Sequence, residues 1–271
     1  MARGGESPFT SQNYRFSCPP VNKGVAPRSD YDGLSRAARH SWAETSMISN
    51  ARMFLAVAAV MVIELGTADA KTTIRYAVVG DSYSIGEGAT EKESWPALLA
   101  RHLTKSGRPV ELVSNPSRTG WTTQDAIEHE LSLFRAARPD FATLMIGVND
   151  WVQGVAPEVF RERLAHLMDE MRAVLPNQKQ LLVVNIPDFS VTPDGPNYAR
   201  GRDISAGLTS FNRIIAEEAR RRGLNVVDIF PLSQKMRGRP ELIAADGLHP
   251  SAKTYEQWEE LIFPAAAALL A

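Results

Sequence analysis

Short apolar runs alternate with longer amphipathic segments from residue 71 onward. A run of about four to eight apolar, often β-branched residues predicts a buried strand, and apolar residues three or four apart predict a helix. The strands are expected at 74–79, 110–113, 141–146, 181–186 and 224–229. The helices are expected at 95–105, 122–137, 158–175, 204–222 and 251–270.

The segment 158–175 carries the clearest helical pattern. Pro157 suits its first turn and Pro176 marks its end, because proline is tolerated only where no intrahelical amide donor is needed. Its apolar residues recur at helical spacing, which predicts one buried face: Phe160, Leu164, Leu167, Met168, Met171, Val174 and Leu175.

Strands separated by helices of this length imply right-handed crossovers and a parallel sheet. We therefore expect an α/β protein with a three-layer, flavodoxin-like fold, in which a five-stranded parallel sheet has helices on both faces. In such a sheet the site lies beyond the carboxyl ends of the strands, where the chain turns into the helices.

The first 46 residues are rich in Gly, Ser, Pro, Arg and Asn and show no apolar periodicity, which is typical of disorder. In 47–70, Arg52 precedes a short apolar run, and an Ala-Asp-Ala sequence ends at Ala70. These are the three parts of a secretory signal peptide. The apolar run is about half the ~20 residues needed to span a bilayer.

We accordingly expect translation to begin at Met47 or Met53 and cleavage to follow Ala70. Secretion or export to the periplasm follows from this interpretation, and residues 71–271 then form one domain with no stable membrane span. The alternative is an uncleaved apolar segment that anchors the protein to a membrane.

Composition narrows the function classes. The chain has 271 residues, 44% of them apolar and 23% charged, with a net charge of −1, which is typical of a globular protein. It has no long basic run, so nucleic acid is not an expected partner. Cys18 is the single cysteine, which excludes an internal disulfide.

The three side chains of a serine nucleophile system, a hydroxyl, an imidazole and a carboxylate, occur near the two ends of the predicted domain. Gly80-Asp81-Ser82 follows the first strand, and Asp246-Gly247-Leu248-His249 lies near the C-terminus. Serine is a weak nucleophile until a base takes its proton, and an acid must hold that base in the right tautomer. Gly120 and Asn149 follow the second and third strands and could supply oxyanion donors.

Taken together, these motifs resemble the SGNH hydrolases, also called GDSL esterases and lipases, over residues 74–262. Gly80-Asp81-Ser82, Gly120, Gly147-Val148-Asn149-Asp150 and Asp246-Gly247-Leu248-His249 appear in the family's order. The resemblance implies that Ser82 attacks an ester carbonyl, His249 acts as base and Asp246 orients His249. It also implies an oxyanion hole formed by the amides of Ser82 and Gly120 and the side chain of Asn149, with no metal or other cofactor.

Tyr83 stands where leucine is common in the family, which predicts a changed pocket wall. Trp121 and Trp151 directly follow two oxyanion candidates, and either core packing or contact with substrate suits them. Asp81 and Asp150 are expected to brace the site through loop amides. The resemblance makes the substrate a small-molecule, lipid or glycan ester.

Several other functions remain open at this point. The same residues could serve an acyltransferase or a carbohydrate O-acetylesterase. A metal-dependent hydrolase could use the carboxylates and imidazole of Asp81, Asp150, Asp246 and His249. A binding protein that has lost its activity would keep the fold.

Overall fold

The computed structural model describes residues 72–271, so the predictions made for 1–70 lie outside the described residues. Five parallel strands form one sheet in the order β2-β1-β3-β4-β5. This order is the flavodoxin-like one, which confirms the predicted fold class. The strands are β1 (Ile74–Gly80), β2 (Val110–Ser114), β3 (Phe141–Met145), β4 (Leu181–Val184) and β5 (Asn225–Val227).

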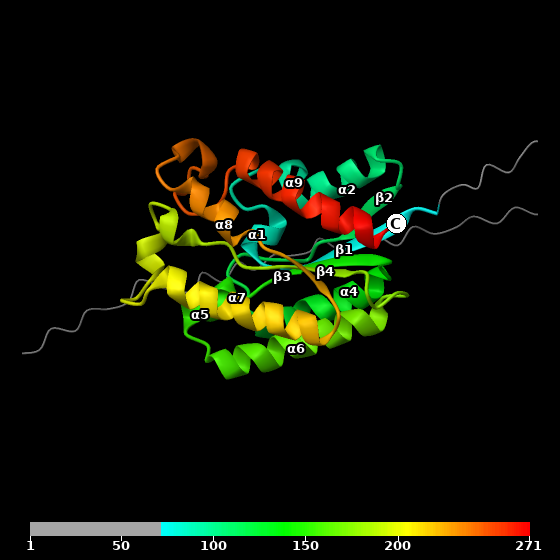
Figure 1. Ribbon diagram of the computed structural model, residues 1–271, viewed down its shortest axis with the longest axis horizontal. Coiled ribbons are helices and arrows are strands. Elements are labelled where there is room, and N and C mark those ends of the chain that lie inside the picture. Colours follow the sequence, from blue (N-terminus) through cyan, green and yellow to red (C-terminus); the bar gives the residue numbers. More distant parts are fainter. Residues whose placement is uncertain (1–71) are drawn as a thin grey trace, which may run out of the picture. The chain divides into compact units, whose positions relative to one another are not determined.

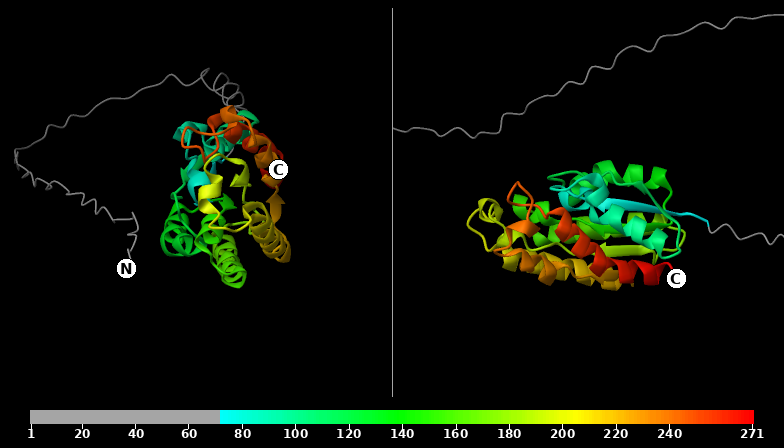
Figure 2. Two further views of the ribbon diagram at one scale, coloured as in Figure 1. Left: turned by 90° about the vertical axis from the view of Figure 1, so that its left-hand side faces the viewer. Right: turned by 90° about the horizontal axis from the view of Figure 1, so that it is seen from above.

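Helices cover both faces of the sheet, as predicted. Figure 1 shows α2 (Trp95–Lys105) and α9 (Ala252–Leu269) on one face, and α4 (Leu131–Ala137), α6 (Pro157–Val174) and α7 (Ile204–Arg221) on the other. Figure 2 shows the same helical layers from two further sides. No helix within residues 72–271 is long and apolar enough to cross a membrane.

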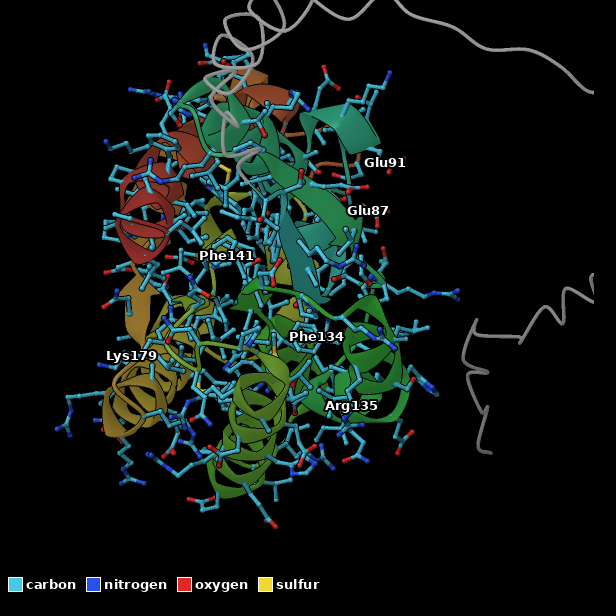
Figure 3. All side chains as sticks on the ribbon, turned by 90° about the vertical axis from the view of Figure 1, so that its right-hand side faces the viewer. Glu87, Glu91, Phe134, Arg135, Phe141 and Lys179 are labelled. Carbon is cyan, nitrogen blue, oxygen red and sulfur yellow. The ribbon has the colours of Figure 1, made fainter. Side chains whose placement is uncertain are left out.

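The apolar face predicted for α6 is buried. Phe160, Leu164 and Leu167 are essentially inaccessible to solvent, as are the two methionines of the stripe. Each such side chain contributes about 1.5–3 kcal/mol when it is fully buried. In Figure 3, Phe134 and Phe141 lie in the interior of the domain whereas Lys179 lies at its periphery.

The segment 122–137 differs from the single helix that its pattern predicts. It comprises α3 (Thr123–Asp125), a π-helical turn (Ala126–Glu130) and then α4. The predicted start is confirmed, because Thr122 and Asp125 form a reciprocal capping box. A π turn inserts an extra residue, so the apolar stripe changes its position around the axis within the helix.

Strands β4 and β5 each end two residues earlier than predicted, at Val184 and Val227. Side-chain amides take over the backbone pairing there. Asn212 accepts from the Ile186 amide and donates to its carbonyl, each at 2.8 Å, and Asn185 accepts from the Ile229 amide at 2.9 Å. The apolar runs therefore extend beyond the residues that pair through backbone hydrogen bonds, and for this reason the sequence predicts strands that are too long.

Three short helices follow strand ends directly, and the sequence pattern did not predict them. They are α1 (Ser82–Ile85), α5 (Val148–Gln153) and α8 (Phe230–Ser233). Segments of four to six residues are too short to show a helical period. Two of them, α1 and α5, carry predicted site residues.

Candidate active site

The end of β1 places Ser82 at the first position of α1. Asp81 caps this helix, and its carboxylate accepts from the Tyr83 amide at 3.1 Å. Glycine is required at Gly80 because a Cβ there would lie 2.1 Å from the Ser84 hydroxyl and 2.6 Å from the Met145 carbonyl. The nucleophile candidate therefore lies in a closely packed turn between the strand and the helix.

His249 and Asp246 lie in one turn of the C-terminal segment. The imidazole Nδ1 is 2.6 Å from one carboxylate oxygen, and the other oxygen accepts from the amides of Leu248 and His249, each at 2.9 Å. Gly247 between them has φ +72°, which favours glycine. When the ring is neutral, Nδ1 carries the hydrogen that it donates to the carboxylate. Nε2 then has no hydrogen and can accept a proton.

Partial burial disfavours ionisation of Asp246, but the Leu248 amide and the ring and amide of His249 outweigh it. The pKa of Asp246 therefore lies below its ordinary value. An ionised carboxylate beside Nδ1 favours the protonated imidazole that forms when His249 accepts a proton. His249 itself is 8% exposed, so its ring is largely shielded from water, whereas the Asp246 side chain is 40% exposed.

Ser82 and His249 line the same pocket, so the structure brings together residues that are far apart in the sequence. Its empty volume is about 300 Å³, including the open mouth. Asn149 and Tyr83 also line it, and the Tyr83 ring lies edge-on to His249 with the centroids 5.7 Å apart. The remaining walls are mainly apolar: Val148, Val152, Phe189, Tyr198 and Leu248.

None of these five wall residues was predicted from the sequence as a site residue. Val148 and Leu248 lie next to motif residues, which is a usable signal. Phe189 and Tyr198 come from the long segment after β4, where no motif or periodicity marks them. Tyr198 is 41% exposed and meets the Phe189 ring edge-on, so it lies at the rim of the pocket.

Asn149 is the second residue of α5. Its Nδ2 donates to the Trp121 carbonyl at 2.9 Å, which leaves its second amide hydrogen for another acceptor. Gln153, one turn further along α5, donates to the Gly120 carbonyl at 3.3 Å. Two side-chain amides therefore link α5 to the Gly120 turn.

The backbone conformation gives a reason for glycine at Gly120. Its φ is +82°, and the turn is closed by the Trp121 amide donating to the Arg118 carbonyl at 3.3 Å. A left-handed conformation of this kind favours glycine. Within residues 72–271 a Cβ on Gly120 would meet nothing within 4 Å.

Asp81 and Asp150 are buried and brace loops, as the sequence analysis proposed. Asp150 accepts from the amide of Thr123 at 2.8 Å and from its hydroxyl at 2.5 Å. Burial is the main cause that raises the pKa of both carboxyls, to about 8 for Asp81, and the charge of Asp150 contributes to the rise at Asp81. Neither lines the pocket of Ser82 and His249.

Arg202 holds the other end of α5. Its guanidinium donates to the carbonyls of Trp151 at 2.6 Å and Val152 at 2.9 Å, and it lies 4.1 Å from the centre of the Trp151 ring. Trp151 is 5% exposed and packs against Phe189. The helix that carries Asn149 is therefore fixed at both ends.

The two tryptophans lie away from the pocket lining. Within the described residues, that lining includes Tyr83 but neither Trp121 nor Trp151. Trp121 faces a separate surface groove with Arg118 and His129. Contact of either tryptophan with substrate thus stays a prediction.

The aspartates and histidine that could alternatively hold a metal do not gather at one point. No group of three or more His, Cys, Asp or Glu side chains within residues 72–271 has a geometry that could hold a metal ion. Asp150 is bound to Thr123, and Asp246 to His249 and its turn amides. The side chains that a metal-dependent hydrolase would use as ligands therefore make separate local contacts.

Known proteins resemble this chain in sequence. The chain is 27% identical to the esterase TesA of Pseudomonas aeruginosa over 71% of this chain and 88% of that protein. It is 23% identical to the thioesterase 1/protease 1/lysophospholipase L1 of Escherichia coli, over 64% of this chain and 74% of that protein.

Solved structures with a similar fold support this relationship. The crystal structure of TesA matches with a TM-score of 0.58 and 25% identity, over 72% of this chain and 99% of that one. A lipase/acylhydrolase from Enterococcus faecalis matches with a TM-score of 0.60 and 21% identity, over 72% and 96%. The model of the GDSL-like Lipase/Acylhydrolase family matches residues 78–257. The chain therefore belongs to the GDSL-like lipase/acylhydrolase family of ester hydrolases.

Proposed function

We propose that this protein hydrolyses carboxylic esters through an acyl-enzyme on Ser82. The observation that carries the proposal is the His249–Asp246 pair, with Nδ1 bound at 2.6 Å, in the same pocket as Ser82. Ser82 Oγ attacks the carbonyl carbon while Nε2 of His249 takes its proton. Collapse of the tetrahedral intermediate breaks the ester bond, and the proton leaves with the alcohol.

Water completes the cycle by the same route. His249 takes a proton from water as it attacks the acyl-enzyme, and returns it to Ser82 Oγ as the acid leaves. Asp246 stays ionised throughout and stabilises the charged imidazole, consistent with its lowered pKa.

The oxyanion of each tetrahedral intermediate is held by the amides of Ser82 and Gly120 and by Nδ2 of Asn149. The second hydrogen of Nδ2 supports this role, since the first is bound to the Trp121 carbonyl. A fixed donor of this kind acts where charge develops and needs no reorganisation during the reaction.

We assign the acyl group to the apolar side of the pocket, which is lined by Val148, Val152, Leu248 and Phe189, with Tyr198 at the rim. The relatives are named an esterase and a thioesterase/lysophospholipase, which supports an acyl ester or thioester as substrate. Since the empty volume of about 300 Å³ includes the open mouth, the enclosed space is smaller still, which favours a short or medium acyl chain over a long one held along its whole length.

The test is hydrolysis of p-nitrophenyl esters, from acetate to palmitate, by the wild type and by Ser82→Ala. We expect turnover by the wild type only, with the optimum at short or medium chains. Equal turnover by both proteins would overturn the serine mechanism. An acetylated oligosaccharide in the same series separates a carbohydrate O-acetylesterase from an esterase of acyl lipids.

We also propose that the protein is exported through a cleaved signal peptide at 47–70, an inference that rests on the sequence of that segment alone. N-terminal sequencing of the protein recovered from the culture medium or periplasm should begin at Lys71. Recovery of the intact chain with the membrane fraction would support the anchored alternative instead.

A further inference from the structure

A carboxyl group without a role in the proposed mechanism lies buried beside the end of β1. Glu130 is the last residue of the π-helical turn, and its side chain is 0% exposed. Ala126 and Phe134, four residues to either side, are equally buried, so Glu130 occupies an apolar position in the chain's pattern. A glutamate is almost never fully buried unless it has partners that require it.

The partners of Glu130 belong to the two turns that carry site residues. Its Oε2 accepts from the Gly80 amide at 3.0 Å and from the Ser117 hydroxyl at 3.5 Å. Gly80 is two residues before Ser82, and Ser117 is three residues before Gly120. One carboxylate oxygen thus joins the nucleophile turn to the turn of a proposed oxyanion donor.

The main chain at Gly80 has little room to move independently of these contacts. The pairing of β1 with β2 ends at Ala77 and Ser114, whereas pairing with β3 continues to Gly80 and Met145. A Cβ on Gly80 would lie 2.6 Å from the Met145 carbonyl. The carboxylate therefore supplies an acceptor beyond the last pair with β2, at a point where the backbone is tightly packed.

The charge on Glu130 is poorly compensated. The pKa of Glu130 is raised to about 8, chiefly by burial and also by the carboxyls of Asp81 and Asp125, although the amide of Gly80 and the hydroxyl of Ser117 lower it. Within residues 72–271 its second oxygen, Oε1, is buried without a hydrogen-bond partner. An unpaired buried acceptor is unfavourable, so a carboxyl kept for stability alone would be expected to have hydrogen-bond partners for both oxygens.

We propose that Glu130 is a positioning residue for ester hydrolysis, whose carboxylate holds the Gly80 amide and the Ser117 hydroxyl and thereby fixes Ser82 relative to the Gly120 turn. The proposal rests on the proposed function, because it assigns Glu130 to the same nucleophile and oxyanion donors. Glu130 touches neither substrate nor reacting atoms, and acts through the main chain on each side of the pocket.

Two variants separate the hydrogen bond from the charge. Glu130→Leu removes the acceptor, and we expect kcat to fall between about tenfold and a hundredfold while KM stays within about twofold, because displaced reacting groups lose rate more than binding. Glu130→Gln keeps an amide oxygen for Gly80, so kcat at neutral pH should recover to within about threefold of the wild type. Glu218→Gln is the matched control, since Glu218 of α7 is another buried carboxyl, 3% exposed, paired with Arg161 of α6 and with Arg222 directly after α7.

The pH profile tests the charge. The ionised carboxylate accepts the Gly80 amide more strongly than the protonated acid, so wild-type kcat should rise near pH 8 by roughly two- to fivefold. Glu130→Gln should lack this rise, and Glu218→Gln should keep it. An unchanged profile in Glu130→Gln would overturn the proposal even if Glu130→Leu does not fold.

The rate of Ser82 labelling by a fluorophosphonate gives a readout that is independent of the ester chosen. It should fall in Glu130→Leu in step with kcat and recover in Glu130→Gln. Folded Glu130→Leu with wild-type kcat and labelling would show that the carboxylate does not position the nucleophile. If Ser82→Ala retains turnover in the same assay, the proposed function has failed, whereas an inert Ser82→Ala beside fully active Glu130 variants defeats only this inference.

Discussion

Replacing Asn149 by alanine removes one proposed oxyanion donor and leaves the nucleophile, base and pocket walls in place. Nδ2 of Asn149 donates one hydrogen to the Trp121 carbonyl at 2.9 Å, and the other is the hydrogen assigned to the oxyanion. The variant therefore loses two interactions, one present in the resting protein and one formed only with the tetrahedral intermediate.

These two losses have different magnitudes and different readouts. The bond to Trp121 is an ordinary side-chain-to-backbone hydrogen bond, so its loss should lower the free energy of unfolding by about 0.5–1.5 kcal/mol. In a domain of this size that corresponds to roughly 1–6 °C in Tm. The oxyanion contact should contribute about 2.7–4 kcal/mol to the transition state, which lowers kcat by 10²–10³. KM should change little, because the ground-state carbonyl does not need this donor.

Gln153→Ala is the matched control. Gln153 also links α5 to the Gly120 turn, through the Gly120 carbonyl at 3.3 Å, but its side chain is not in the pocket lining. Losing this exposed contact should change kcat by no more than about twofold. Steady-state hydrolysis of a short p-nitrophenyl ester, together with thermal unfolding, measures both variants. An equal loss of kcat in the two would mean that α5 acts by holding the loop, and the oxyanion assignment of Asn149 would be refuted.

Three further outcomes follow from the contacts. Asp246→Asn should lower kcat by a factor on the order of 10⁴ with little change in KM, because the carboxylate at 2.6 Å sets the His249 tautomer and stabilises the charged ring; steady-state kinetics test this. The pKa of Glu130 is raised in the folded state to about 8, so the native protein binds more protons than the unfolded chain above pH ~4.5, and Tm should fall as pH rises from 5 to 8. Thermal scans should show a smaller fall in Glu130→Gln, and an identical slope would contradict the raised pKa. Gly207→Ala would place a Cβ 1.8 Å from Nε1 of Trp151, so we expect about 1–3 kcal/mol of destabilisation, which urea unfolding would measure.

The elements with a long, regular apolar pattern were predictable from the sequence. The helix at 95–105 matches α2 at both ends, and α6 begins and ends within one residue of the prediction. Each has an apolar stripe that only one secondary structure buries on one side. Strand ends were less predictable, because the Asn185 and Asn212 side chains replace the ladder beyond β4 through contacts that are distant in sequence.

Buried polar residues show where sequence reasoning ends. As a charged residue in a helical segment, Glu130 is expected to face solvent. Its position four residues from both Ala126 and Phe134 nevertheless puts it on their buried face. Trp151 follows a motif residue and suits a pocket wall, yet its ring packs against Arg202 and Phe189. The direction in which the side chains of these two residues point depends on contacts with other segments, which no local sequence pattern specifies.

The sequence by itself determined the α/β class, the parallel sheet, and the motif residues that stand at the carboxyl ends of the strands, because hydrophobic period and chain order are local properties. The tertiary structure alone decided that Phe189 and Tyr198 wall the pocket of Ser82 and His249, and that Glu130 joins two turns of the site. The residues concerned are 13 to 167 positions apart in the sequence, from Ser117 and Glu130 at one extreme to Ser82 and His249 at the other. Such contacts form only when the sheet and its helices pack, since burial and hydrogen bonding then select one direction for each side chain.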